Sequence, residues 1–236
     1  GEQRTLADAE DAARRITAHY RARGYPVARA YVPAQDVTDG RLRIEVIEGR
    51  IDRVVLDNRS RLHDGAVALE RDGLRGGDTI ETAPIDRALQ ILIDTPGVGG
   101  ARATLQPGDA VGSSRLDIAL EPAPALNGVV GMDNFGSVYT GRVNAFALLS
   151  LNSPLGRGER WSLFASSTGS GLQFGQLKAD LPLGHDGTRA TLTHNRMRYR
   201  LGDSFASLQS SGRFASSHAQ LSHPWVLTRL ERVDAA

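Results

Sequence analysis

The sequence predicts two small α+β modules followed by a run of antiparallel strands. Three observations lead to this fold class. Apolar positions fall at helical spacing near the N-terminus, a helix-strand-strand pattern recurs more completely after Gly49, and helical periodicity ends beyond Glu121. Alternating segments of roughly nine to twelve residues, separated by Gly, Asn, Ser and Pro, follow that point. The chain of 236 residues is long enough for two or three such domains.

The first module is predicted to open with an amphipathic helix from Thr5 to Arg23. Thr5 suits the N-cap and Gly24 suits the C-terminal stop. The apolar stripe between them consists of Leu6, Ala9, Ala13, Ile16 and Tyr20. Because this stripe must be buried, the strands that follow are expected to cover it.

The hairpin after this helix is predicted to have one dry and one wet face. Residues 25–32 have the pattern of a first strand and residues 33–40 that of a turn. The second strand alternates strictly, which predicts a core face of Leu42, Ile44 and Val46 and a solvated face of Arg41, Arg43 and Glu45. In the turn, the amide of Gln35 is expected to bond an otherwise unpaired backbone group, with direct substrate contact as the alternative.

The second module is predicted to contain strand, helix, helix, strand and strand. Residues 51–56 form the first strand, and a helix between 60 and 74 has one face made of Leu62, Ala66 and Leu69. The second helix spans 79–93, with Pro84 in its first turn and a stripe of Ile85, Ala88, Leu89 and Leu92. Strands at 101–105 and 116–120 complete the module. The first module shows only the last three of these five elements.

Beyond a Pro-Ala-Pro-Ala linker at residues 122–125, the sequence predicts six strands. These are residues 128–134, 140–152, 159–167, 171–181, 187–199 and 213–224. Their lengths suit tilted membrane-spanning strands of about nine to eleven residues. Tight turns at 153–158 and 182–186, against a longer loop at 200–212, are typical of outer-membrane barrels. Soluble sandwiches alternate as well, so a soluble β domain is the alternative on pattern alone.

Composition excludes several kinds of chemistry. The chain has no Cys, which excludes thiolate metal sites, Cys nucleophiles and disulfides. Its net charge of +1 is spread along the sequence, which argues against nucleic acid as a partner. No phosphate loop, nucleophile elbow or His-Glu-x-x-His helix occurs, and Asp133 with Asn134 is assigned to a turn rather than to a calcium site. The sequence therefore predicts no enzyme activity, no catalytic residue, no metal and no cofactor.

Several short motifs, taken in order, resemble one family. Three of them resemble the periplasmic POTRA module of the two-partner secretion transporters, also called haemolysin secretion/activation proteins: YRARGY at 20–25, AYVPAQD at 30–36 and VIEGRI at 46–51. Two are similar to the second POTRA module of that family: LIDTPGV at 92–98 and LQPG at 105–108. Others resemble the first strands of its barrel: DNFGS at 133–137, TGR at 140–142, NSPLGRGE at 152–159, YRLG at 199–202 and HP at 223–224.

The resemblance implies a domain order and a function. Residues 1–50 would be a first POTRA module, 51–122 a second, and 123–236 the start of an incomplete antiparallel transmembrane β-barrel. Such a protein would lie in the cell outer membrane with its POTRA modules in the periplasm. It would recognise the N-terminal secretion domain of an exoprotein and translocate that exoprotein to the cell surface, with outer-membrane lipid as its other partner. The alternatives are a BamA-like factor for outer-membrane protein assembly and a soluble β-rich binding domain.

Departures from the family pattern predict that the sequence is a fragment cut at both ends. The first module lacks its opening strand and first helix, and the family's plug helix is absent as well. Six strands cannot close a barrel, for which about eight are needed. The family's Val-Arg-Gly loop motif, followed by an aromatic residue, is absent.

Client binding is expected to occur by strand addition to an exposed sheet edge. The predicted edge is the strand Ala101, Arg102, Ala103, Thr104 and Leu105, assisted by the helix residues Ile85 and Leu89. Arg41 and Arg43 most simply form a solvated strand face, and contact with an exoprotein is the alternative for that pair.

Overall fold

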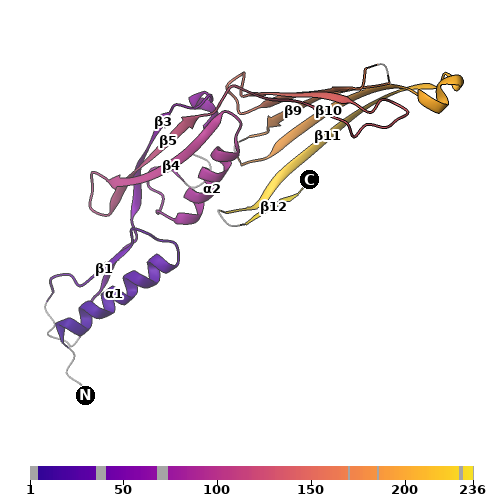
Figure 1. Ribbon diagram of the computed structural model, residues 1–236. Helices are drawn as coiled ribbons and strands as arrows, with labels where there is room; N and C mark the ends of the chain where they lie inside the picture. Colours follow the sequence, from indigo (N-terminus) through magenta and orange to yellow (C-terminus); the bar gives the residue numbers. More distant parts are fainter. Residues whose placement is uncertain are drawn as a thin grey trace. The chain divides into compact units, whose positions relative to one another are not determined.

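The computed structural model describes residues 5–35, 41–67, 74–169, 171–184, 186–228 and 231–235. Two compact units can be distinguished, one comprising residues 1–57, 69–90 and 102–119 and the other residues 58–68, 91–101 and 120–236. Two α-helices belong to the first half of the chain, and long strands make up the second half (Figure 1). No helix in the described ranges is both long enough and apolar enough to cross a membrane.

Helix α1 (Leu6–Ala22) confirms the first predicted element. The hydroxyl of Thr5 accepts from the Asp8 backbone N–H at 3.3 Å, and the Asp8 carboxylate accepts from the Thr5 N–H at 2.7 Å. This reciprocal capping box satisfies two backbone donors at the helix start. The helix ends where Gly24 adopts a φ of +93°, a conformation that disfavours other residues. Ala9 and Ala13 are buried on the inner stripe, but Leu6, predicted on the same stripe, is 65% exposed because it is the first residue of the helix.

The hairpin beside α1 is short. Strands β1 (Arg29–Tyr31) and β2 (Glu45–Ile47) pair antiparallel, and α1 runs alongside β1 (Figure 1). Tyr31 lies directly opposite Glu45, and its hydroxyl donates to the Glu45 carboxylate at 2.6 Å. The side-chain amide of Gln35 donates to the carbonyl of Arg43 and accepts from its N–H, both at 2.8 Å. The predicted structural role of Gln35 is thereby confirmed; residues 36–40 lie outside the described ranges.

The predicted dry face of the second strand is wrong at two of its three positions. Leu42 is 42% exposed and Val46 is 37% exposed, and only Ile44 is half-buried. Residues 41–44 are not part of a strand. Alternating side chains point to opposite faces only in a pleated strand, so alternation in the sequence does not place these residues on one face. Within β2 it is Ile47 that turns inward, toward Gly112, where an added Cβ would lie 2.6 Å from the Ile47 Cγ2.

The next elements are β3 (Arg50–Asn58), α2 (Thr82–Asp94), β4 (Val98–Pro107) and β5 (Ser113–Pro122). The three strands are those predicted, although each is longer than expected, and they form a sheet in the order β3-β5-β4. The predicted helix at 60–74 is represented among the described residues only by a 3-10 turn at Asp64–Ala66, and Leu69 lies outside them. The buried residues of the first unit include Ile51, Leu74, Ile80, Leu89, Leu116 and Ile118.

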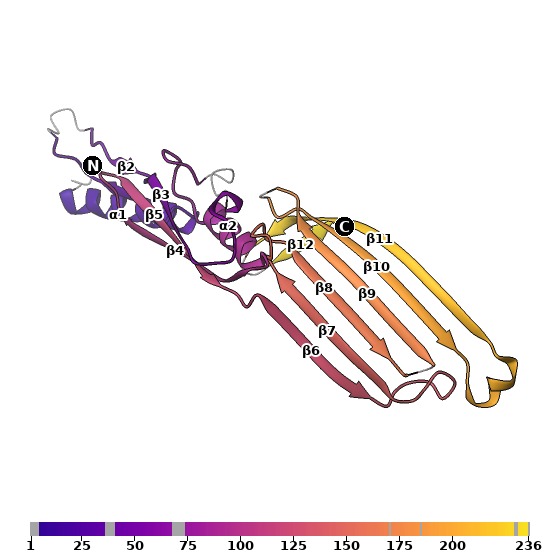
Figure 2. The ribbon, with the colours of Figure 1, turned by 90° about the horizontal axis from the view of Figure 1, so that it is seen from above.

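The remaining strands form one antiparallel sheet. They are β6 (Leu126–Asp133), β7 (Asn144–Asn152), β8 (Arg160–Ser167), β9 (Leu172–Pro182), β10 (Arg189–Arg200), β11 (Ser211–Leu227) and β12 (Arg232–Ala235). Each strand pairs with its neighbour in sequence, and β6 to β11 run side by side (Figure 2). The prediction of six strands is corrected to seven in the described ranges. β12 is missed because its Arg-Val-Asp-Ala alternation is only four residues long, too short a run to distinguish a strand.

Cross-strand register assigns each side chain to one of two faces, because directly opposed residues point the same way. Leu149 opposes Leu163, Leu163 opposes Leu177, and the row continues to His194. We call this side the apolar face; its larger members are Leu126, Val130, Met132, Leu149, Leu151, Trp161, Leu163, Leu177, Leu192 and Leu221. We call the other side the polar face; it includes Ser150, Ser162, Gln176, Lys178, Asp180, Thr193, Asn195 and Ser216. A row of aromatic rings, Phe146, Phe164 and Phe174, crosses this face among the polar side chains.

The apolar face is the more exposed of the two. Leu163, Leu177 and Leu192 are each about half exposed, at 50%, 48% and 49%. Their sequence neighbours on the polar face, such as Ser162, Gln176 and Thr193, are half-buried and therefore less exposed than these leucines. A sheet in water buries its apolar side, so this arrangement is the reverse of a soluble sandwich and matches a sheet whose outer surface contacts lipid.

The connections at the two ends of this sheet differ in part as predicted. At one end, short connections join β7 to β8, β9 to β10 and β11 to β12. At the other end, residues 134–143 and 201–210 form longer loops that pack together through Tyr139 and Phe205, whose ring centroids lie 5.0 Å apart. The connection at 168–171 on this side is nevertheless short.

The Tyr31–Glu45 pair predicts a pH dependence for the hairpin. The hydrogen bond to Glu45 raises the pKa of the Tyr31 phenol above its usual value, and partial burial adds to this. The bond therefore contributes its full stability below the unfolded pKa of Tyr, about 10, and loses it as pH rises through the higher folded pKa. In ring-labelled NMR titrations, Glu45→Gln should lower the Tyr31 pKa. An unchanged titration in the variant would contradict this assignment.

Candidate functional site: a sheet edge and a buried turn

Strand β4 lies at an edge of its three-stranded sheet. The order β3-β5-β4 leaves one side of β4 without a strand partner in the described part of the chain. The predicted client residues Ala101, Ala103 and Leu105 are half-buried on one face, and Thr104 points to the exposed face. Because an edge strand presents free backbone donors and acceptors, β4 has the geometry that strand addition requires.

The helix residues predicted to assist this edge differ in accessibility. Ile85 and Leu89 lie one turn apart on the same stripe of α2. Ile85 is half-buried, whereas Leu89 is only 6% exposed and belongs to the core. A client at this helix would therefore meet Ile85 and not Leu89.

Arg41 and Arg43 lie apart from this edge along the chain, in the hairpin of the first module. Both side chains are exposed. The backbone N–H and C=O of Arg43 are already bonded to the Gln35 side-chain amide. That amide occupies the groups an added strand would use at Arg43, so the hairpin is a poorer docking edge than β4 there.

The turn between β7 and β8 is the most tightly built polar site in the second unit. Its residues Asn152, Ser153 and Glu159 are 4%, 1% and 2% exposed, and they are the buried polar or charged residues found in the described ranges. The Glu159 carboxylate accepts from the backbone N–H of Leu155 and, at 3.0 Å, from that of Arg157. A buried carboxylate is tolerated because it closes the turn by satisfying two backbone donors.

Ser153 completes the turn from inside. Its backbone N–H donates to the Glu159 carbonyl at 2.7 Å, and its hydroxyl accepts from the Gly158 N–H at 2.9 Å. Ser153 has a φ of +49°, a left-handed conformation that is unfavourable for a residue with a Cβ. These bonds hold that conformation in place, and they make the turn a fixed shape.

The same turn is attached to the segments at 58–63 and 95–98 within the second unit. The N–H of His63 donates to the Gly156 carbonyl at 2.8 Å, and the Arg61 Nε donates to the Asn152 carbonyl at 3.3 Å. The Arg61 N–H also reaches the carbonyl of Gly97 at 3.0 Å. These bonds join the turn to a segment that lies some ninety residues earlier in the chain; Arg61 and Asn152 are 91 residues apart.

Glycines make this close approach possible. A Cβ on Gly97 would lie 2.7 Å from the Ser153 Cβ, and one on Gly156 would lie 2.5 Å from the His63 ring. A Cβ on Gly158 would lie 2.5 Å from the Thr95 methyl. All three also have positive φ, so both space and backbone conformation require glycine at these positions.

Arg189 connects β10 to the turn. Its Nε lies 3.0 Å from both carboxylate oxygens of Asp180, and a terminal nitrogen donates to the Gly158 carbonyl at 2.9 Å. Both side chains of the Arg189–Asp180 pair are largely buried, at 18% and 21% exposure. Such a charge-assisted, partly buried pair fixes geometry more firmly than an exposed one.

Sequence reasoning treated residues 153–158 only as a tight turn and missed its buried polar interior. The available signal was an excess of specific residues: a turn of this length needs one glycine, but this one carries two, together with Asn, Ser and Glu at its ends. The interpretation of Asp133 as a turn residue is confirmed, since its carboxylate accepts from the Phe135 N–H at 3.1 Å. Within the described ranges, no group of three His, Cys, Asp or Glu side chains converges on a potential metal position.

These features define a class of protein: small α+β modules joined to an inside-out antiparallel sheet, as in POTRA-bearing β-barrel proteins. Residues 1–49 match the ShlB-type POTRA domain, and residues 112–233 match the haemolysin secretion/activation protein ShlB/FhaC/HecB. The chain belongs to this haemolysin secretion/activation protein family.

A sequence relative supports this membership, and two solved structures share the fold. The heme/hemopexin transporter protein HuxB of Haemophilus influenzae is 30% identical over 230 residues, which cover 97% of this chain and 40% of HuxB. CdiB from Escherichia coli has a similar fold, with a TM-score of 0.75 at 24% identity over 95% of this chain and 42% of CdiB. BamA from Haemophilus ducreyi is a more distant fold neighbour, with a TM-score of 0.57 at 13% identity over 94% of this chain and 42% of that chain. The sequence thus spans about 40% of the length of HuxB.

The buried carboxylate predicts a large effect of mutation in the β7–β8 turn. Glu159→Ala leaves two part-buried N–H groups without an acceptor and should lower the free energy of unfolding by about 1 to 3 kcal/mol. Arg157→Ala, at an exposed side chain of the same turn, is the matched control and should change it by less than about 0.5 kcal/mol. Urea titration of full-length protein refolded into lipid vesicles measures both. Equal stability of the two variants would show that the carboxylate does not hold the turn.

Proposed function

We propose that this chain is part of an outer-membrane transporter that captures a secreted exoprotein in the periplasm and translocates it to the cell surface. The observation that carries the proposal is the inverted sheet, whose leucine-rich face is about half exposed and whose other face is polar. Membership of the haemolysin secretion/activation family supports it. HuxB is named as a heme/hemopexin transporter, so the relative also belongs to a transport class.

The orientation of the sheet follows from its two ends. The turns at 153–159 and 183–188 would face the periplasm, because the first of them is bonded to residues 61 and 63 of the preceding module. The loops at 134–143 and 201–210 would face the cell exterior. Trp161 and Trp225 both lie near the turn end and are 37% and 71% exposed, which suits the aromatic belt of a membrane interface.

The polar face would line the interior of the barrel. Gln176 donates to Asn195 at 2.8 Å, and Asn195 donates to Ser216 at 3.2 Å, so three adjacent strands share one chain of amide and hydroxyl groups. Such a surface is compatible with water and with the backbone of an extended client. Nothing in this arrangement calls for catalysis, and transport alone accounts for it.

The client would be recognised before it enters the barrel. The proposed boundaries are residues 1–50 and 51–122 for the two POTRA modules and 123–236 for the barrel strands. The partner would be an exoprotein whose N-terminal secretion domain adds a strand to the β4 edge, with Ala101, Ala103, Thr104 and Leu105 at the contact and Ile85 beside it. Main-chain hydrogen bonds would supply the affinity, which suits a client that arrives unfolded.

Replacing one backbone donor of β4 tests strand addition. Thr104→Pro removes an N–H while proline is tolerated at sheet edges, and it should weaken binding of the secretion domain on the order of tenfold. Thr104→Val is the matched control, because it keeps the N–H and the β-branched shape, and it should bind normally. Pull-down with the full-length transporter and titrated client measures the effect, and circular dichroism checks that both variants fold. Equal binding by the proline variant would rule out strand addition at this position.

A further inference from the structure

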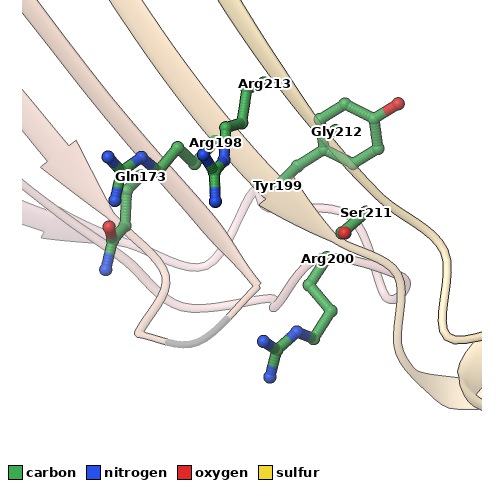
Figure 3. Close-up of a pocket in the computed structure, with 7 residues that line it drawn as sticks. All are labelled: Gln173, Arg198, Tyr199, Arg200, Ser211, Gly212 and Arg213. Atoms are coloured by element: carbon green, nitrogen blue, oxygen red, sulfur yellow. The ribbon is translucent and has the colours of Figure 1, made fainter.

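Four arginines gather on the apolar face where β10 and β11 approach their connecting loop. Arg198 lies directly opposite Gln173 on one side and Arg213 on the other, and Arg200 lies opposite Ser211. Arg196 occupies the same face one pair further in, opposite Ala215. We call these four residues the arginine cluster. Three of them, Arg198, Arg200 and Arg213, line an open surface pocket together with Gln173, Tyr199, Ser211 and Gly212 (Figure 3).

The cluster has no acidic partner in the described part of the chain: no carboxylate there lies within ion-pair distance of any of its four guanidinium groups. Other arginines do have such partners, including Arg189 with Asp180 on the polar face and Arg232 with Asp94. Arg198 and Arg213 are even directly opposed across two strands, an arrangement of like charges that destabilises a sheet. An anion held between them would remove that repulsion.

The backbone under the cluster is fixed from the other face. Tyr199 opposes Gly212 on the polar side, and a Cβ on Gly212 would lie 2.5 to 2.7 Å from the Tyr199 ring. Gly212 therefore leaves the space that this ring fills, between the two strands that carry Arg198 and Arg213. Figure 3 shows the side chains of Arg198 and Arg213 extending from neighbouring strands on the side of Gln173, with Arg200 lying apart from them.

The position of the cluster selects its ligand. Along β10 the same face runs from Ala190 and Leu192 to Arg196, Arg198 and Arg200, so the positive charge begins where the apolar side chains end. Leu192 and Arg196 are four residues apart, or about 13 Å along a strand. Lipid presents the same sequence of chemistry, acyl chain followed by charged headgroup, and guanidinium groups bind phosphate through paired hydrogen bonds. A client inside the barrel would instead contact the polar face.

We propose that the arginine cluster binds the phosphate groups of an outer-leaflet lipid whose acyl chains contact the apolar face. The proposal rests on the proposed outer-membrane function, because it requires the apolar face to be in lipid. The cluster fixes the barrel in depth at its outer rim, as Trp161 and Trp225 do near the opposite end. Phosphate binding also relieves the repulsion between Arg198 and Arg213, so the lipid stabilises the hairpin of β10 and β11.

Charge removal at the cluster tests the proposal in full-length transporter purified in nonionic detergent. The probes are lipid A with both phosphates, lipid A with its phosphates removed, and inorganic phosphate alone. The variant Arg198→Gln with Arg213→Gln should bind the phosphorylated lipid on the order of tenfold or more weakly, and the dephosphorylated lipid unchanged. Arg198→Lys with Arg213→Lys should retain a large part of the binding, which separates charge from misfolding.

The matched control is Arg21→Gln with Arg157→Gln, which removes the same charge from two exposed arginines outside the cluster and should bind phosphorylated lipid normally. The thermal unfolding midpoint is a second readout, and the effect of the cluster variant on it should change sign when phosphorylated lipid is added. Without lipid the cluster variant should be at least as stable as the parent, and with phosphorylated lipid it should be less stable. Equal affinity of the cluster and control variants for phosphorylated lipid would overturn the proposal. It would also be overturned if the parent bound inorganic phosphate as tightly as it binds the phosphorylated lipid. Fractionation of cells that express the parent tests the proposed outer-membrane location separately. The lipid-binding measurement uses purified protein in detergent, so the two experiments can fail independently.

Discussion

The pleat of the sheet from β6 to β11 is the constraint on which the second half of the chain depends. Once these strands pair in the observed register, Leu149, Leu163 and Leu177 fall on one surface, and Ser162 and Gln176 fall on the other. A slip of one residue between any two strands would exchange the faces of one of them. Backbone hydrogen bonds thus set the division between a lipid-compatible outside and a polar inside, and the side chains are suited to the face that the pleat gives them.

One end of this sheet is fixed to the chain that precedes it. The β7–β8 turn provides that attachment through Asn152, Ser153 and Glu159, which are buried and hydrogen-bonded where a surface turn is usually solvated. The glycines at 97, 156 and 158 allow the backbones to approach. The second unit therefore has a firmly bonded turn, and β4 keeps an edge without a strand partner in the described part of the chain.

Local pattern predicted the regular elements well. The stripes of α1 and α2 and the alternation of β6 to β11 each have one period sustained over many residues, so chemistry and geometry agree there. Prediction failed where the pattern was short: Leu42 and Val46 alternate correctly but lie at or beside a three-residue strand, and β12 alternates over only four residues. The predicted edge at β4 has the right topology, yet Leu89 is in the core. The buried turn and the arginine cluster could not be predicted, because both depend on cross-strand or long-range partners that one sequence does not reveal.

The most direct test of this account is the lipid exposure of two adjacent residues on β9. Leu177 is assigned to the lipid side and Gln176 to the interior, and this chain has no native cysteine to interfere. Leu177→Cys and Gln176→Cys, each spin-labelled in full-length protein otherwise free of cysteine and reconstituted in vesicles, can be compared by relaxation with oxygen and with a water-soluble nickel chelate. The account predicts that the label at 177 is relaxed mainly by oxygen and the label at 176 mainly by the chelate. Equal accessibility of both labels to the chelate would contradict it.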